Sequence, residues 1–250
     1  MLFDQKIIQH IKKLSEESRD IHDITKGLLS FLNVPKIKVS GNPIPKGPLL
    51  VVSNHPGVFD SLALVSTISR KDIQFIALST YALFGQQVKN HLLPIYRKRK
   101  LNHRLYEYPL WLQATRKIPP TLSTKEIKNR NKDSIKRAAN LLDIGSAVII
   151  FPAGSAGKKL PNSQWKAGIG YLINLIINPL TKVIFAKIEG TKQKDIFAYM
   201  RPLIRKMFFR PNEITIDFSK PFILRQLIGG INDPKIITKV IEEKYNQYFS

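Results

Sequence analysis

The chain has 250 residues, of which 43% are hydrophobic and 9% aromatic, a composition that suits a folded globular protein and excludes a disordered one. Its 40 lysine and arginine residues against 18 acidic residues give a formal net charge of +22. Such a charge favours polyanionic partners: nucleic acid, anionic lipid headgroups or phosphorylated substrates. The sequence has no cysteine, which excludes disulfides, thiolate metal ligands and a cysteine nucleophile.

The apolar runs of the sequence bear on its location. The first residues turn charged almost at once, unlike a signal peptide. No apolar run approaches the roughly 20 residues that a helix needs to cross a bilayer. We therefore expect a cytoplasmic protein with no transmembrane helix, whose contact with a membrane surface is peripheral.

The chain opens with a predicted amphipathic helical segment, residues 1–35. Apolar residues recur at helical spacing through residues 2–32, and Pro35 ends the pattern. A turn rich in proline and glycine, residues 41–48, then leads into Leu49-Leu-Val-Val-Ser53. This short and almost fully apolar run predicts a strand buried on both faces of a sheet.

Helices and strands alternate along the rest of the chain. In chain order we expect a helix at 60–69, a strand at 73–78, a helix at 81–92, a helix at 132–142, a strand at 146–151, a helix at 165–177, strands at 182–188 and 213–218, and a helix at 234–248. Such alternation predicts an α/β fold, a single domain in which helices flank a mixed, mainly parallel sheet. That domain is expected to span residues 36–250.

One stretch of this domain is unusually basic. Residues 89–137 carry 14 lysine and arginine residues and three acidic ones, an excess of 11 that is half of the net charge. The regular pattern also weakens there, so we expect a basic surface insertion at about 98–131. It contains Tyr106, Tyr108 and Trp111, whose rings would suit the headgroup region of a membrane.

The feature that points to chemistry is a histidine and an aspartate five positions apart, His55 and Asp60, between a predicted buried strand and a predicted helix. Ligands of open α/β sheets bind outside the carboxyl ends of the strands, where this pair is expected to lie. A histidine can take a proton from a hydroxyl near neutral pH, and a carboxylate on its other ring nitrogen would fix the tautomer. The Pro56-Gly57 turn would let Asp60 fold back towards the ring.

Two other interpretations stay open at this point. Asp60 is also the type of residue that caps the N-terminus of a helix, in which case His55 is an ordinary loop histidine. The charge excess, interleaved with Tyr96 and Trp111, would also suit a basic module that binds nucleic acid. However, the sequence holds no recognised nucleic-acid motif, and such a module leaves the placement of His55 and Asp60 unexplained.

Four stretches resemble the motifs of the glycerolipid acyltransferase superfamily, which includes glycerol-phosphate and lysophospholipid acyltransferases. Its first motif, Asn-His-x4-Asp after an apolar strand, is matched by Asn54-His55-Pro-Gly-Val-Phe-Asp60. Its second, an apolar stretch ending in arginine, is matched by Leu92-Leu-Pro-Ile-Tyr-Arg97. Its third, a strand ending in Phe-Pro-Glu-Gly-Thr-Arg, is matched in part by Ile149-Ile-Phe-Pro-Ala-Gly-Ser-Ala156, and its fourth, an apolar strand, is similar to Val183-Ile-Phe-Ala-Lys-Ile188. The resemblance covers about residues 36–225.

The resemblance implies an acyltransferase in which His55 is the general base on a lipid hydroxyl and Asp60 orients it. The acyl donor would be acyl-CoA or acyl carrier protein, with no acyl-enzyme, no metal and no tightly bound cofactor. The implied partners are a lipid acceptor, an anionic membrane surface and, for the second donor, acyl carrier protein, whereas nucleic acid is not expected. The implied substrate-binding residues are Asn54, Arg97, Phe151, Pro152, Gly154, Ser155 and Lys158.

The third motif departs from the family pattern. Ala153, Ser155 and Ala156 stand where the family has glutamate, threonine and arginine, which help to hold the acceptor's phosphate and glycerol. Lys158 and Lys159 either supply phosphate-binding charge from this glycine-rich turn or are ordinary solvated lysines. The departures favour a lysophospholipid or another lipid alcohol over glycerol 3-phosphate as acceptor. They also leave open an inactive membrane-associated scaffold of the same fold.

Overall fold

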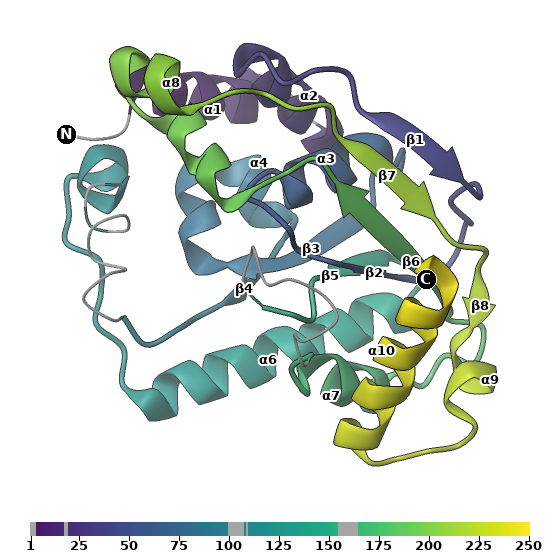
Figure 1. Cartoon of the computed structure of the whole chain (residues 1–250). Helices are drawn as coiled ribbons and strands as arrows, with labels where there is room; N and C mark the ends of the chain where they lie inside the picture. Colours follow the sequence, from purple (N-terminus) through teal and green to yellow (C-terminus); the bar gives the residue numbers. More distant parts are fainter. Residues whose placement is uncertain (1–3, 18–19, 100–107, 109, 155–164) are drawn as a thin grey trace.

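The computed structural model describes residues 4–17, 20–99, 108, 110–154 and 165–250 (Figure 1). Eight strands among these residues form one sheet in the order β1-β7-β6-β2-β5-β3-β4, with β8 paired to the start of β6. The strands are β1 Lys38–Gly41, β2 Leu49–Ser53, β3 Ile73–Leu78, β4 Leu92–Ile95, β5 Ala147–Ile150, β6 Lys182–Glu189, β7 Thr215–Phe218 and β8 Phe222–Ile223. The pairings of β6 with β7 and β8 are antiparallel and the others are parallel, which confirms the predicted mixed, mainly parallel sheet.

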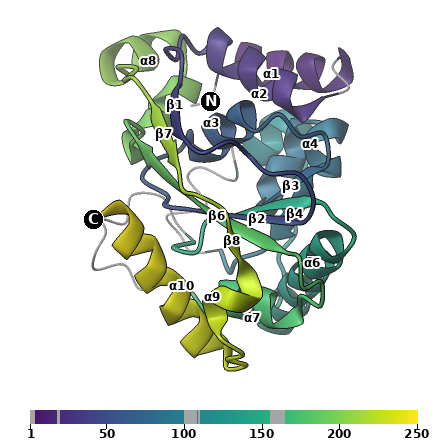
Figure 2. The same ribbon diagram turned by 90° about the vertical axis from the view of Figure 1, so that its right-hand side faces the viewer.

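Helices cover both faces of the sheet (Figures 1 and 2). On one face lie α1, α2 and α3, and on the other lie α6, α7 and α10. The helical elements are α1 Gln5–Glu17, α2 Ile21–Phe31, α3 Asp60–Thr67, η1 Ser79–Phe84, α4 Gln86–Asn90, α6 Thr124–Asp143, α7 Gly168–Leu175, η2 Gln193–Tyr199, α8 Pro202–Phe208, α9 Leu224–Ile228 and α10 Pro234–Phe249. Within the described residues, every helix is too short or too polar to cross a membrane.

The position of β2 between two cores explains why its sequence is apolar at successive positions. Successive side chains of a strand point to opposite faces. Leu49 and Val51 of β2 pack in the core under α1, α2 and α3, whereas Leu50 and Val52 pack in the core under α6, α7 and α10. All four side chains are completely buried. Strand β2 therefore joins the two cores, and it holds the loop that follows it in a fixed position.

Several predicted elements have different boundaries in the structure. The predicted N-terminal segment is two helices, α1 and α2, and the second begins after Asp20, whose carboxylate accepts from the N–H of His22. The predicted helix at 81–92 was wrong as a single element, because η1 and α4 divide at Gly85 and residue 92 begins β4. Helix α6 begins eight residues before its predicted start, where Ser123 and Glu126 form a capping box.

A glycine fixes the contact between two helices on the lower face of the sheet. A Cβ atom on Gly170 of α7 would lie 1.8 Å from the carbonyl oxygen of Pro234, the first residue of α10. Nothing lies within 4 Å of the corresponding position on Gly168, two residues earlier in the same helix. The Gly-x-Gly pattern at 168–170 therefore serves helix packing at its second glycine.

We predict that Gly170→Ala lowers the free energy of unfolding by about 2–3 kcal/mol, because the added methyl group forces α7 and α10 apart. The matched control is Gly168→Ala, which is expected to leave stability unchanged or raise it by up to about 1 kcal/mol, the helix propensity of alanine over glycine. Chemical denaturation of both variants measures the difference. Equal effects of the two substitutions would contradict the close packing at position 170.

Candidate active site

The first and third motifs meet at one edge of the sheet. Strands β2 and β5 are parallel neighbours, so the loops that follow them, residues 54–59 and 151–154, leave the sheet at the same edge. The ring of Phe151 lies against the ring of His55, with 4.8 Å between the ring centroids. Phe151, Pro152 and Ala153 are buried, whereas Gly154 is exposed. The structure thus brings together His55 and Phe151, two of the predicted site residues.

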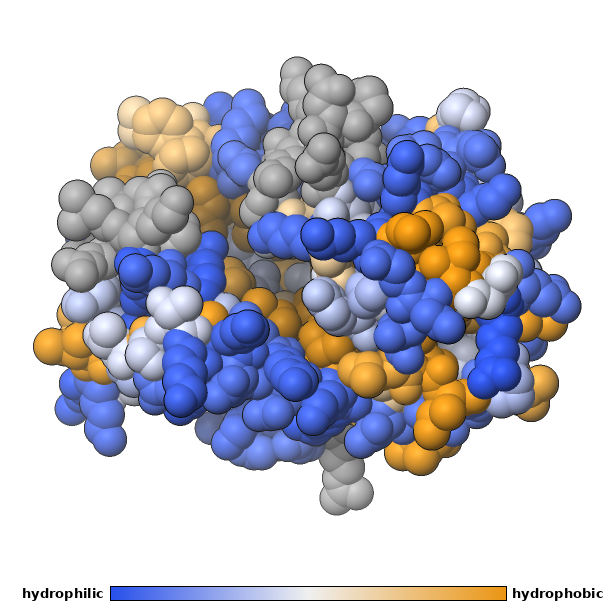
Figure 3. All heavy atoms as spheres, turned by 90° about the horizontal axis from the view of Figure 1, so that it is seen from below, coloured by the Kyte–Doolittle hydropathy of each residue, from blue (hydrophilic) through white to orange (hydrophobic). Residues whose placement is uncertain are grey.

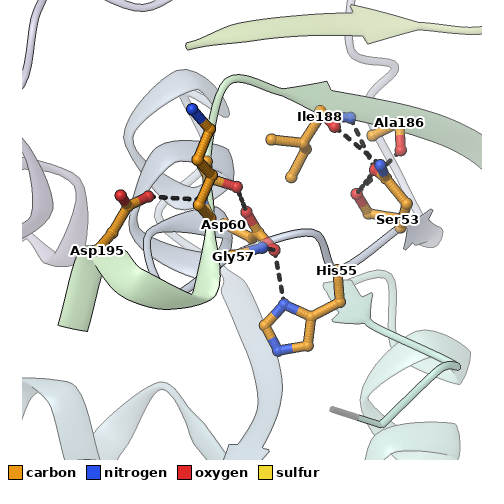
Figure 4. Close-up of polar contacts among 10 residues, drawn as sticks. Ser53, His55, Gly57, Asp60, Ala186, Ile188 and Asp195 are labelled. Carbon is orange, nitrogen blue, oxygen red and sulfur yellow. Dashed lines mark hydrogen bonds and ion pairs between the residues drawn. The ribbon is translucent and has the colours of Figure 1, made fainter. Parts of the chain in front are cut away.

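His55 and Asp60 form a hydrogen-bonded pair, as Figure 4 shows. The distance from Nδ1 of His55 to Oδ2 of Asp60 is 2.6 Å. Because a carboxylate oxygen accepts, Nδ1 carries the proton in this bond, and Nε2 of the neutral ring keeps its lone pair. The Asp60 side chain is completely buried, while that of His55 is 22% exposed, and Nε2 points away from Asp60. This geometry suits a general base whose free nitrogen faces a substrate.

Asp60 accepts hydrogen bonds from two further groups. The N–H of Gly57 donates to the same oxygen that binds His55, at 2.8 Å, and the hydroxyl of Thr191 donates to the other oxygen. Asp60 is the first residue of α3, and the preceding Phe59 makes no side-chain cap. The interpretation of Asp60 as a simple helix cap is therefore wrong, since its carboxylate bonds to other segments.

Thr191 is a site residue that the sequence reasoning missed. It follows β6, the parallel neighbour of β2 on the side away from β5, and it is buried. The loop after β2 lies directly on the backbone of residues 191 and 192, because a Cβ atom on Gly57 would lie 2.3 Å from the backbone nitrogen of Lys192. The usable signal was its place at the end of a predicted apolar strand, although the sequence did not reveal which strands are neighbours.

Asn54 is bound to the backbone of β6 through both atoms of its side-chain amide. Its Nδ2 donates to the carbonyl of Ile188 at 2.8 Å, and its Oδ1 accepts from the N–H of the same residue at 2.7 Å. The adjacent Ser53 hydroxyl donates to the carbonyl of Ala186 at 2.9 Å. Asn54 thereby extends the pairing of β2 with β6 by one residue, and it fixes where the loop carrying His55 begins.

Two tyrosines and a second aspartate near Asp60 have raised pKa values. Burial raises the pKa of Tyr81, and the negative charge of Asp60 raises it further, while the hydrogen bond with Ser61 opposes the shift. Burial also raises the pKa of Tyr199 well above its ordinary value. Both tyrosine hydroxyls therefore stay protonated at neutral pH. Burial raises the pKa of Asp195 as well, although its bond from the Lys192 N–H opposes the shift.

A basic pocket lies at the same edge of the sheet, two and three strands along from β2. Its space is about 230 Å³, and its lining includes the last residues of β3 and β4, Leu78 and Ile95. Arg97 and its neighbours 98 and 99 line it too. Asn131 of α6 clamps this segment, since its side-chain amide exchanges hydrogen bonds of 2.7 and 2.9 Å with the backbone of Tyr96. The second motif therefore supplies cations to the edge that carries His55.

Lys166, a cation that the sequence analysis did not assign to the site, lies at the third motif. A Cβ atom on Gly154 would lie 2.7 Å from Nζ of Lys166, so the ammonium group rests directly on this turn. The backbone N–H of Lys166 also donates to the carbonyl of Pro152 at 3.0 Å. The predicted site residues Ser155 and Lys158 lie outside the described residues. In the described part of the chain, no three histidine, aspartate or glutamate side chains gather as metal ligands would.

Comparison with known proteins places this arrangement. The family model named Acyltransferase matches residues 36–183, more than half of the chain, and the match includes His55, Asp60 and the turn at Phe151. Among solved structures, the chain is similar to the 1-acyl-sn-glycerophosphate (LPA) acyltransferase PlsC from Thermotoga maritima, with 14% identity, 98% of this chain and 95% of that chain covered, and a TM-score of 0.41. Likeness at that level adds nothing to the family match. Comparison with curated protein sequences finds no match.

The family match confirms the resemblance that the motifs indicated and identifies the chain as an enzyme. The chain belongs to the Acyltransferase family.

Proposed function

We propose that this acyltransferase moves a fatty acyl group from the thioester of acyl-CoA or acyl carrier protein to the hydroxyl of a lysophospholipid or another lipid alcohol. The observation that carries the proposal is the 2.6 Å hydrogen bond between Nδ1 of His55 and the buried carboxylate of Asp60. It leaves one histidine nitrogen free to accept a proton, at the sheet edge where the family motifs meet.

The reaction needs one base and no covalent enzyme intermediate. Nε2 of His55 takes the proton of the acceptor hydroxyl as its oxygen attacks the thioester carbonyl. The tetrahedral intermediate collapses, the carbon–sulfur bond breaks, and the thiolate takes a proton from the imidazolium. The products are an ester and the free thiol of the donor, and His55 returns to its neutral form.

Asp60 acts through His55. Its carboxylate holds the proton on Nδ1, which keeps Nε2 basic, and its negative charge stabilises the imidazolium that forms during attack. Gly57 and Thr191 hold the carboxylate from its far side, at 2.8 Å for the Gly57 N–H. In this mechanism Asp60, Thr191 and Asn54 are positioning residues, and His55 is the group that contacts the substrate.

We assign binding of the acceptor's phosphate to the cations at the edge of the sheet that carries His55. Arg97 lines the basic pocket at the ends of β3 and β4, and the Lys166 ammonium lies on the Gly154 turn beside Phe151. We propose that Lys166 supplies the charge that the family's arginine would give at position 156, which is alanine here. With Lys166 in this role, the enzyme would be active although its third motif lacks the usual arginine.

We predict that His55→Ala lowers the rate of acyl transfer by about 100-fold or more, the range attributed to a positioned general base. Asp60→Asn is expected to lower kcat strongly as well, because an amide cannot stabilise the imidazolium. Labelled acyl-CoA and acyl carrier protein, offered with a panel of lipid alcohols, measure the product. Equal product from wild type and His55→Ala would sink the mechanism. Product from neither protein would favour an inactive scaffold.

We predict that Thr191→Val lowers kcat about tenfold with little change in KM, because Asp60 loses a hydrogen bond worth about 1–3 kcal/mol. Thr191→Ser keeps the hydroxyl and is expected to restore most of the rate. Thermal unfolding of both variants separates positioning from general stability. A Thr191→Ser enzyme as slow as Thr191→Val, at equal stability, would count against the hydroxyl's role.

We predict that Arg97→Gln and Lys166→Gln each raise the KM for a phosphorylated acceptor about tenfold, since a charge-assisted hydrogen bond is lost. A neutral lipid alcohol should show no such change. The control is Lys71→Gln, which removes an exposed charge just before β3, at the opposite edge of the sheet. Equal KM values for all three variants would show that neither cation binds the acceptor.

A further inference from the structure

Helix α8 presents large apolar side chains to the surface. Leu203, Met207 and Phe208 are exposed to 72%, 62% and 52% of their possible area. Three such residues lie within one short helix, whereas single exposed apolar residues need no explanation. A cluster of this kind marks a surface that another apolar body covers.

Basic residues lie among and beside these apolar residues in the sequence. Arg201, Lys206 and Arg210 are all exposed, and residues 200–212 include no acidic residue. The fourth cation of the segment, Arg205, lies 4.0 Å from Asp4 beside α1. Apolar side chains flanked by lysine and arginine fit the boundary between acyl chains and anionic headgroups. The basic side chains would contact the lipid phosphates while the apolar side chains enter the acyl region below them.

The helix is tied to the catalytic pair at both of its ends. Tyr199, just before α8, and Phe209, just after it, each pack against Phe59, with ring centroids 5.9 Å apart in both contacts. Phe59 is the residue next to Asp60. The connection from β6 through η2 and α8 to β7 stays at one end of the sheet, because β6 and β7 are antiparallel neighbours (Figure 1). A body that seats on α8 is therefore held at a fixed place relative to the site.

A second exposed segment adjoins α8. Leu110 packs in the same small apolar cluster as Met200 and Ile204. Beyond it, Leu112 and Ile118 are exposed, with the basic residues 116 and 117 between them. Trp111, which the sequence suggested as a membrane anchor, is instead half-buried, and Tyr106 lies outside the described residues. The exposed apolar groups at this end thus lie on α8 and beside Leu110.

We propose that α8 is the surface by which the enzyme docks on an anionic lipid bilayer, with Leu203 and Met207 inserted and Arg201, Lys206 and Arg210 at the headgroups. The inference deepens the proposed function, because a lipid acceptor would reach His55 from the bilayer on which α8 rests. Charge complementarity selects a lipid surface over an apolar protein partner.

The test compares binding of the full-length chain to two kinds of vesicle, phosphatidylcholine alone and phosphatidylcholine with about 30 mol% phosphatidylglycerol. The phosphatidylglycerol makes the vesicle surface anionic. Leu203→Ser/Met207→Ser is expected to weaken binding to the anionic vesicles about tenfold or more. Arg201→Gln/Lys206→Gln/Arg210→Gln is expected to weaken it about a hundredfold and to remove most of the preference for phosphatidylglycerol.

The matched control is Ile177→Ser/Leu180→Ser. These two side chains, 73% and 69% exposed, lie between α7 and β6, at the other edge of the sheet. Figure 3, which views the molecule from below Figure 1, shows hydrophobic patches among hydrophilic side chains on the side of the molecule that carries α6, α7 and α10. Binding unchanged in the control but weakened by the α8 substitutions supports the proposal. Equal loss in both, or no loss in either, overturns it.

Two further measurements keep the outcomes distinct. Light scattering reports whether Leu203→Ser/Met207→Ser converts a dimer into a monomer, and that result without a change in vesicle binding would make α8 a contact between copies and overturn lipid docking. Acyl transfer to a short-chain, water-soluble acceptor reports the chemistry alone and should be unchanged in the α8 variants. If no acyl transfer is found while binding still depends on α8, the proposed function fails and the docking surface stands.

Discussion

A carboxylate with no exposure to water is the constraint on which the rest of the site depends. Burying a charge in a protein interior is costly unless donors surround it. Asp60 obtains its donors from His55, Gly57 and Thr191, so the loop after β2 and the turn after β6 must both close around it. The reciprocal bonds of Asn54 with Ile188 hold these two segments in register. The orientation of the His55 ring is therefore a product of the whole strand arrangement.

Much of the fold follows from patterns that are local in sequence. Strand β2 was predicted at its observed bounds because four apolar residues in a row fill both faces of a buried parallel strand. The position of His55 and Asp60 followed from the same strand, since the pair lies only a few residues beyond its end. Strand β3 was likewise predicted at its observed bounds. Strands marked by a run of apolar residues could thus be located without knowledge of their neighbours in the sheet.

The parts that escaped prediction depend on contacts between distant segments or on exposed edges. Thr191 reaches Asp60 across 131 positions of sequence. Lys166 contacts Gly154 although the two residues are 12 positions apart in sequence. The two edge strands carry weak signals: all four residues of β1 are exposed, and β4 contains Pro94, which an edge strand tolerates because one side of it makes no ladder bonds.

The antiparallel pairing of β6 with β7 has a consequence for how such enzymes diversify. Glu189, at the end of β6, lies opposite Thr215, at the start of β7. The 25 residues between them therefore form one excursion that leaves the sheet and rejoins it at the neighbouring position. That excursion carries Thr191, Tyr199 and all of α8. Beyond Thr191, this excursion could be lengthened, shortened or exchanged while the sheet register and the hydrogen bond to Asp60 stay intact. Access for substrates and preference for a particular lipid could then evolve separately from the acid–base chemistry.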